Sequence, residues 1–202
     1  KLGMIPPEIK KLNCFCKNGK IKDFSIPTTI KEIGEGCFYN CTNLTSIVIP
    51  STISKLENEI FYNCKSLQTI IIEENSPLTY LPKKLFYKNK SLKEIKLPTT
   101  ITEIDDCCFE GCTSLEEIQL PNIKKLRLLC FKNCYSLSKI ELSSELTYID
   151  SFCFEHCLSL QEIIINDNVK ELGGQLFYNC TSLTSVRLST SLTKLDKLLF
   201  FK

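Results

Sequence analysis

Apolar residues recur along this chain at a nearly constant interval. One phenylalanine marks each interval, and the steps between successive phenylalanines are 22, 23 or 25 residues. These anchor residues are Phe15, Phe38, Phe61, Phe86, Phe109, Phe131, Phe154, Phe177 and Phe200. A period of this length is typical of a solenoid, in which each unit buries its apolar face only against its neighbours. We therefore expect a stack of similar coils.

Each interval also contains a short LxxIxI segment that predicts a β-strand. After the anchor Phe38, the three apolar positions are Leu44, Ile47 and Ile49. The alternation of the last two indicates a strand with those side chains inward, so stacked units should form a parallel sheet. A second apolar pair, eight and five residues before each anchor, should complete the inner lining. These pairs run from Ile30/Ile33 to Leu192/Leu195.

The combined columns resemble a known repeat motif. LTSIVIPSTISKLENEIFYNC (Leu44 to Cys64) and LEEIQLPNIKKLRLLCFKNC (Leu115 to Cys134) follow the pattern LxxIxLPxxLxxIxxxAFxxC of the BspA-like leucine-rich repeat family. The resemblance covers about residues 13–202. Two departures are that Cys often replaces the Ala before the anchor, and that one coil, EENSPLTYLPKKLFYKNK, carries two extra residues.

The resemblance implies an α/β repeat solenoid. Its expected form is a curved, right-handed stack with a parallel β-sheet on the concave face and short helical turns or irregular coils elsewhere. We expect one domain over residues 1–202, with about eight repeats of 22–25 residues. A partial N-terminal cap (1–13) and an incomplete last repeat should end the stack, since terminal coils need polar caps.

The thirteen cysteines follow the repeat and are interpreted through it. Six lie three residues after an anchor and five lie one before it, and only Cys16 and Cys107 fall outside these columns. Small, buried thiols are the expected reading. Two alternatives remain open: zinc held by i, i+4 pairs such as Cys130/Cys134, and disulfides between stacked coils.

Nothing in the sequence points to catalysis or to a cofactor. The chain lacks phosphate-binding, dinucleotide-binding, zinc-protease and serine-hydrolase motifs. The single histidine, His156, lies in a column with Asn residues and is expected to be a turn residue. With 25 Lys and Arg against 23 Asp and Glu, the charge balance predicts no nucleic-acid partner. No apolar run is long enough to cross a bilayer, so direct membrane insertion is not expected.

The outward strand positions are the candidate site for a protein partner. They are expected to line the concave face and to form a small apolar area at Val48 and Ile71. Glu94 and Glu117 should lie side by side, which is unfavourable unless a partner or Lys96 compensates. The candidate residues are Ser46, Val48, Thr69, Ile71, Glu94, Lys96, Glu117, Gln119, Lys139, Glu141, Glu162 and Ile164.

A second surface is the column directly after the anchor. Tyr39, Tyr62 and Tyr87 fall in successive coils, and Tyr178 occupies the same position later in the chain. These rings are expected either to cover the edge of the coils or to form an aromatic stripe for a partner.

Two functions therefore compete. The first is a non-catalytic leucine-rich-repeat scaffold or regulator that binds a protein partner on its concave face. The second is a cell-surface adhesin for host or matrix proteins, because bacterial and protist members of the resembled family are associated with attachment. The start, KLGMIPPEIKK, lacks the apolar stretch of a secretory signal, and a cysteine-rich core fits a reducing compartment. A cytoplasmic location is thus expected, with the cell surface as the alternative.

Overall fold

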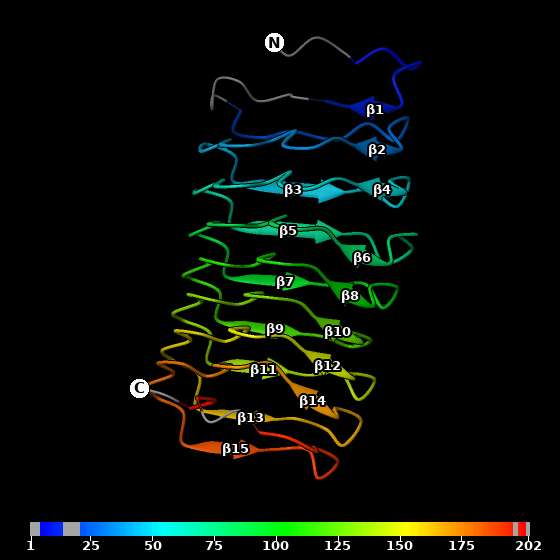
Figure 1. Cartoon of the computed structure of the whole chain (residues 1–202). Coiled ribbons are helices and arrows are strands. Elements are labelled where there is room, and N and C mark those ends of the chain that lie inside the picture. The colour runs from blue at the N-terminus through cyan, green and yellow to red at the C-terminus, as the bar shows by residue number, and fades with distance from the viewer. Residues whose placement is uncertain (1–4, 14–20, 196–197, 201–202) are drawn as a thin grey trace.

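The computed structural model describes residues 5–13, 21–195 and 198–200. The expected anchor Phe15, the cysteines Cys14 and Cys16, and parts of the expected caps lie outside the described residues. The described strands stack in chain order from β1 to β15 (Figure 1).

The strands form two columns that run the length of the stack. The first column has longer strands: β3 (Ser46–Ile49), β5 (Thr69–Ile72), β7 (Glu94–Lys96), β9 (Glu117–Gln119), β11 (Lys139–Glu141), β13 (Glu162–Ile164) and β15 (Ser185–Arg187). The second has two-residue strands: β1 (Lys11–Leu12), β2 (Glu32–Ile33), β4 (Lys55–Leu56), β6 (Tyr80–Leu81), β8 (Glu103–Ile104), β10 (Lys125–Leu126), β12 (Tyr148–Ile149) and β14 (Glu171–Leu172). All strand pairs in the described part of the chain are parallel, as the stacking of equivalent segments requires.

The first column confirms the expected strand and its orientation. In β3, Ile47 and Ile49 are buried, whereas Ser46 and Val48 are exposed. Neighbouring strands pair at equivalent repeat positions, so Ile47 lies beside Ile70 of β5. A slip of one residue would expose every isoleucine of a strand, and the alternation therefore specifies the register.

The second column was expected only as inner lining, and the structure shows that it also forms strands. The second member of the apolar pairs from Ile30/Ile33 to Val169/Leu172 is the second residue of a strand, and in Ile33 and Leu81 it is fully buried. This column is divided into β1-β2-β4 and β6-β8-β10-β12-β14. The division falls at the coil with two extra residues, where the longer connection between β5 and β6 shifts β6 out of the ladder.

Of the short helical turns or irregular coils expected outside the sheet, the prediction of helical turns is wrong. No helix occurs in the described ranges, and accordingly none there could cross a membrane. Alternate N–H groups instead bond to the next coil: Phe38 N donates to Ile60 O at 2.9 Å, and Asn40 N donates to Tyr62 O at 2.9 Å. The N–H groups between them close tight turns, as Tyr39 N does on Gly36 O at 2.9 Å. In a helix, all of these N–H groups would donate to carbonyl groups of the same coil.

Two left-handed residues in each coil produce this pattern. The positions two before and two after the anchor both have positive φ, as Gly36 (58°) and Asn40 (57°) do around Phe38. In a later coil, the position two residues after the anchor Phe154 holds His156, which has a φ of 59°. Gly and Asn tolerate this region best, which explains their frequency after the anchor. The result is a β-solenoid of the leucine-rich-repeat type, built from strands and turns.

The core is a continuous column of phenylalanine rings and aliphatic side chains. Successive anchor rings from Phe38 to Phe200 lie 5.2–5.9 Å apart between centroids. The inner lining predicted from the sequence is buried in the central coils. The last described coil is the exception, because Leu195 and the anchor Phe200 are 53% and 49% exposed there.

Candidate protein-binding face

The twelve candidate residues all lie on one face of the first strand column. Their side chains occupy the outward positions of β3, β5, β7, β9, β11 and β13, and every one of them is exposed. The parallel ladders place equivalent residues of successive coils next to one another. The sequence therefore placed these residues together correctly, while their role in binding stays a prediction.

The apolar area predicted at the N-terminal part of this face is present. Val48 and Ile71 are register partners in β3 and β5, and they are 43% and 49% exposed. Their neighbours along the strands, Ile47 and Ile70, are buried in the core. Two branched side chains thus stand on a rigid sheet with much of their surface in water, as is common at interfaces.

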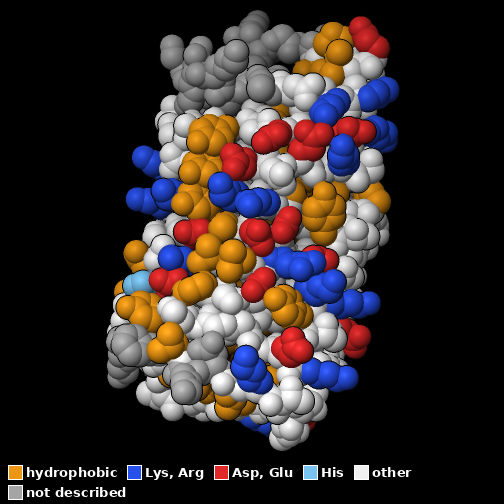
Figure 2. Space-filling view, viewed as in Figure 1, with side chains coloured by type: hydrophobic (Ala, Val, Ile, Leu, Met, Phe, Trp, Pro, Cys, Tyr) orange, Lys and Arg blue, Asp and Glu red, His pale blue; other side chains and the backbone are white. Residues whose placement is uncertain are grey.

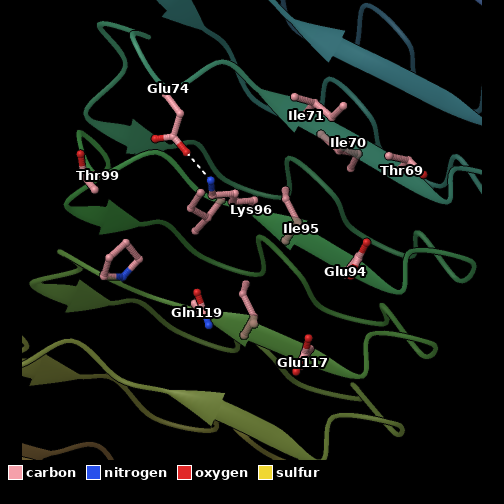
Figure 3. Close-up of a pocket in the computed structure, with 13 residues that line it drawn as sticks. Thr69, Ile70, Ile71, Glu74, Glu94, Ile95, Lys96, Thr99, Glu117 and Gln119 are labelled. Carbon is pink, nitrogen blue, oxygen red and sulfur yellow. Dashed lines mark ion pairs between the residues drawn. The ribbon is translucent and has the colours of Figure 1, made fainter.

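The face is hollowed over β5, β7 and β9. One hollow, of about 650 Å³, is lined by strand residues that include Ile71, Lys96 and Gln119, and by Glu74 from the loop after β5 (Figure 3). A second hollow, of about 460 Å³, adjoins it and is lined by Lys93 and Glu116 among others. Thr69, Glu94 and Glu117 line both hollows.

Glu94 and Glu117 form the common border of the two hollows. Glu116 N donates to Lys93 O at 3.0 Å, which sets the following residues, Glu94 and Glu117, side by side at the start of β7 and β9 (Figure 3). Neither carboxylate makes an ion pair with another described residue. The expected compensation by Lys96 does not occur, because its ammonium group binds Glu74 at 2.8 Å. That hydrogen bond is the main cause that raises the pKa of Lys96.

The distal part of the face carries a different set of contacts. Lys139 Nζ pairs with Glu141 on the same strand at 2.9 Å, and this hydrogen bond raises the pKa of the lysine. Ile164 is 59% exposed beside its register partner Arg187. Of the four carboxylates in the acidic middle predicted from the sequence, Glu141 is thus neutralised, whereas Glu94, Glu117 and Glu162 form no ion pair with a described residue. Only Glu94 and Glu117 border the two hollows.

The tyrosine column forms a stack at the edge of the coils. The centroids of Tyr39 and Tyr62 are 4.6 Å apart, as are those of Tyr62 and Tyr87. The ammonium groups of Lys84 and Lys88 lie over the Tyr87 ring, at 5.8 and 5.0 Å. Burial, followed by the neighbouring phenols, raises the pKa of Tyr62. Because the rings cover one another's faces, this arrangement favours the role of covering the coil edge.

The thiols three residues after each anchor make a repeated contact. Each donates to the carbonyl oxygen of the anchor phenylalanine one coil earlier, over 3.0–3.3 Å, in Cys64, Cys112, Cys134, Cys157 and Cys180. Burial raises the pKa of Cys64 to about 12. Such thiols stay protonated near neutral pH and are poor nucleophiles. The expected reading, small buried thiols, is confirmed at these positions.

The two alternatives for the cysteines have different outcomes. Ten of the described cysteines are buried and form no disulfide, including the stacked residues Cys108, Cys130 and Cys153, whereas Cys41 is disulfide-bonded. Disulfides therefore do not join the successive central coils. Within the described ranges, no group of three or more Cys, His, Asp or Glu is arranged to hold a metal ion, so the structure gives the zinc alternative no support.

His156 is a turn residue, as predicted. Its N–H donates to Tyr178 O at 2.8 Å and its φ is 59°. The ring lies edge-on to Tyr178, and Nδ1 lies 3.2 Å from Glu155, whose carboxylate also pairs with Lys132 at 2.9 Å. These contacts bind one coil edge to the next.

Sequence reasoning missed the residues that complete the two hollows. Glu74 belongs to the coil with two extra residues, so no column predicts where its side chain goes. Lys93 and Glu116 lie just before the strands, and their side chains approach to 3.8 Å. Each of these two residues directly precedes a strand. This shared position in the repeat could have predicted that they lie side by side, because residues at equivalent repeat positions stack.

The chain belongs to the family described as the BspA type leucine rich repeat region. Six copies of the repeat match, over residues 8–135 and 79–202. This confirms the resemblance seen in the sequence. No curated protein matches the chain.

Solved structures of bacterial proteins share the fold. A leucine rich cell surface protein from Faecalibacterium prausnitzii is 28% identical, with a TM-score of 0.72 over 80% of this chain. The chain spans 46% of that protein's length. The T. pallidum leucine rich repeat protein is 25% identical, with a TM-score of 0.72 over 79% of this chain and 77% of its own. A leucine-rich repeat protein from Eubacterium ventriosum shares the fold at 20% identity, with a TM-score of 0.58 over 89% of this chain and 61% of its own.

Proposed function

We propose that this chain is a non-catalytic module that binds a protein partner on the outward face of its first strand column. The observation that carries the proposal is the exposed pair Val48 and Ile71, which stands on a rigid sheet beside the two hollows. Burial of two such side chains contributes roughly 1.5–3 kcal/mol to association, taking about half of the usual gain for each. Charged side chains of both signs surround apolar ones on the side of the stack seen in Figure 2.

A rigid solenoid suits this role because its face needs little ordering on binding. The core columns hold each strand in register, so the outward side chains are presented at spacings set by the stack. Pre-organisation of this kind lowers the entropic cost of association. For this module we propose a cytoplasmic location, since the buried described cysteines other than Cys41 form no disulfide, as expected in a reducing compartment. The disulfide at Cys41 favours the cell-surface alternative considered below.

The test combines partner capture with substitutions on the face. Val48→Asp together with Ile71→Asp should lower the affinity for captured partners at least tenfold, because two charges would be buried in the contact. The matched control is Tyr80→Asp with Tyr135→Asp, two residues of similar exposure that lie outside the first strand column. Partners would be captured from cells of the source organism by crosslinking, and their affinities measured by calorimetry. Equal affinity for the wild type and the Val48/Ile71 variant would contradict the proposal.

A second candidate function is adhesion at the cell surface. It is favoured by the likeness to the F. prausnitzii protein, which is described as a cell surface protein. In that case the same face would bind host or matrix proteins. Protease treatment of intact cells distinguishes the two candidates: an adhesin is cleaved, whereas a cytoplasmic module survives until the cells are lysed.

A further inference from the structure

The two hollows over β5, β7 and β9 carry an excess of negative charge. Their walls include four carboxylates, from Glu74, Glu94, Glu116 and Glu117, and two ammonium groups, from Lys93 and Lys96. Both lysines are already engaged, Lys96 with Glu74 at 2.8 Å and Lys93 with Glu116 at 3.8 Å. The charge left without a direct partner is therefore that of Glu94 and Glu117, on the border between the hollows.

An apolar wall lies next to these carboxylates. Ile71 lines the larger hollow and continues as the Val48–Ile71 pair onto the neighbouring strand. Figure 3 shows Ile71 and Glu94 on adjacent strands of the same face. The surface thus offers an apolar contact and an acidic contact within one continuous depression.

We infer that this depression receives an extended segment of the partner protein, with a Lys or Arg side chain between Glu94 and Glu117 and an apolar side chain against Val48 and Ile71. The inference rests on the proposed function and specifies the chemistry of the partner. A cation between the two carboxylates removes their mutual repulsion and is attracted by both. Arg is the better match, because its guanidinium group offers donors in two directions.

The shape of the depression favours an extended chain. The two hollows, of about 650 and 460 Å³, adjoin at Thr69, Glu94 and Glu117 and together extend over β5, β7 and β9. A small cationic ligand would contact only Glu94 and Glu117 and would leave Val48 and Ile71 exposed to water. Exposed ion pairs contribute little by themselves, so stable binding needs the apolar contact as well.

The test uses a random dodecapeptide library displayed on phage as the probe. The wild-type protein should enrich peptides with Lys or Arg at least twofold over the starting library, together with large apolar residues. The variant Glu94→Gln/Glu117→Gln should lose the enrichment in Lys and Arg and should bind the best wild-type peptide at least tenfold more weakly. The ratio of the wild-type affinity to the variant affinity should decrease as the salt concentration is raised, because screening weakens exposed charge pairs.

A matched control separates this effect from net charge. Glu145→Gln/Glu171→Gln makes the same change in charge at two exposed carboxylates that lie off this face, and it should retain the enrichment. Thermal melting of all variants checks that the solenoid is intact, as expected for exposed positions.

The outcomes distinguish this inference from the function on which it rests. Enriched peptides without an excess of Lys and Arg, or an excess that survives in the Glu94/Glu117 variant, would overturn the cationic segment and leave the binding face in place. Enrichment that is unchanged in the Val48→Asp/Ile71→Asp variant, or no enrichment of any peptide, would overturn the proposed function as well.

Discussion

The inner columns and the outward strand face of this solenoid follow opposite rules. Inside, each repeat position holds nearly the same residue type: the anchor is always Phe, and Cys predominates three residues later. Outside, equivalent positions vary between apolar, basic and acidic side chains, as at Ile71, Lys96 and Glu141. Inner residues must fit the same neighbours in every coil, whereas outward residues meet only water and a partner. Uniform columns therefore mark packing, and irregular columns mark the surface available for recognition.

The largest expected effect comes from a truncation in the inner columns. Phe109→Ala would remove a ring that stacks on both neighbours, at 5.3 Å from Phe86 and from Phe131. The free energy of unfolding should fall by about 3–5 kcal/mol, since the neighbouring coils cannot close the cavity. Gln119→Ala, an exposed position on the outward face of the same coil, should change it by no more than about 0.5 kcal/mol. Urea unfolding measures both, and similar losses would contradict the division between the two sets of positions.

A smaller effect is expected at the left-handed turn positions. Gly36 has a φ of 58°, and an added Cβ would meet only the Tyr39 side chain, at an ordinary contact distance of 3.5 Å. Gly36→Ala should therefore lower the free energy of unfolding by about 1 kcal/mol, almost entirely through backbone strain. Gly36→Asn is the control, because Asn adopts this conformation at the other left-handed position of the same coil, Asn40, with a φ of 57°, and should cost less. Equal costs for Ala and Asn would show that backbone strain is not the cause.

The smallest effect is a pH-dependent one at the N-terminal coils. Glu57 accepts hydrogen bonds from Lys11 Nζ at 2.8 Å, Glu35 N at 3.0 Å and Lys55 Nζ at 3.3 Å, and these lower the pKa of its carboxyl group from 4.5 to about 2. A pKa lowered by folding adds stability above the unfolded value of about 4.5, and this stability is lost as the pH falls through about 2. Glu57→Gln should therefore slightly lower the melting temperature at pH 7 and have a vanishing effect below pH 2.

Glu145→Gln provides the comparison for that experiment. This exposed carboxylate makes no ion pair with the described residues, so its replacement should leave the melting temperature nearly unchanged at both pH values. A Glu57→Gln effect of the same size at pH 7 and below pH 2 would show that charge is not what Glu57 contributes.

Much of the fold follows from the period of the sequence. The strand positions, their inward residues and the parallel register are all implied by equal spacing, because equal units stack at equal positions. The neighbourhood of Val48 and Ile71 could be predicted for the same reason. The absence of helical turns could not be predicted from spacing alone. The choice between a helix and tight turns depends on which hydrogen-bond acceptors the neighbouring coil offers. The second strand column was missed because two residues, such as Lys55 and Leu56, are too few to show a period.

The sequence by itself determined the inner columns, the stacking order and the set of outward residues, because these depend on periodicity and on the burial of apolar side chains. Only the tertiary structure decided how the charges on the face are matched. Lys96 binds Glu74, a residue of the irregular coil, and Lys139, the register partner of Glu117, binds Glu141. Neither Glu94 nor Glu117 therefore forms an ion pair with a described residue. Such pairing depends on distances between side chains in different coils, and an insertion of two residues changes those distances without changing the repeat around it.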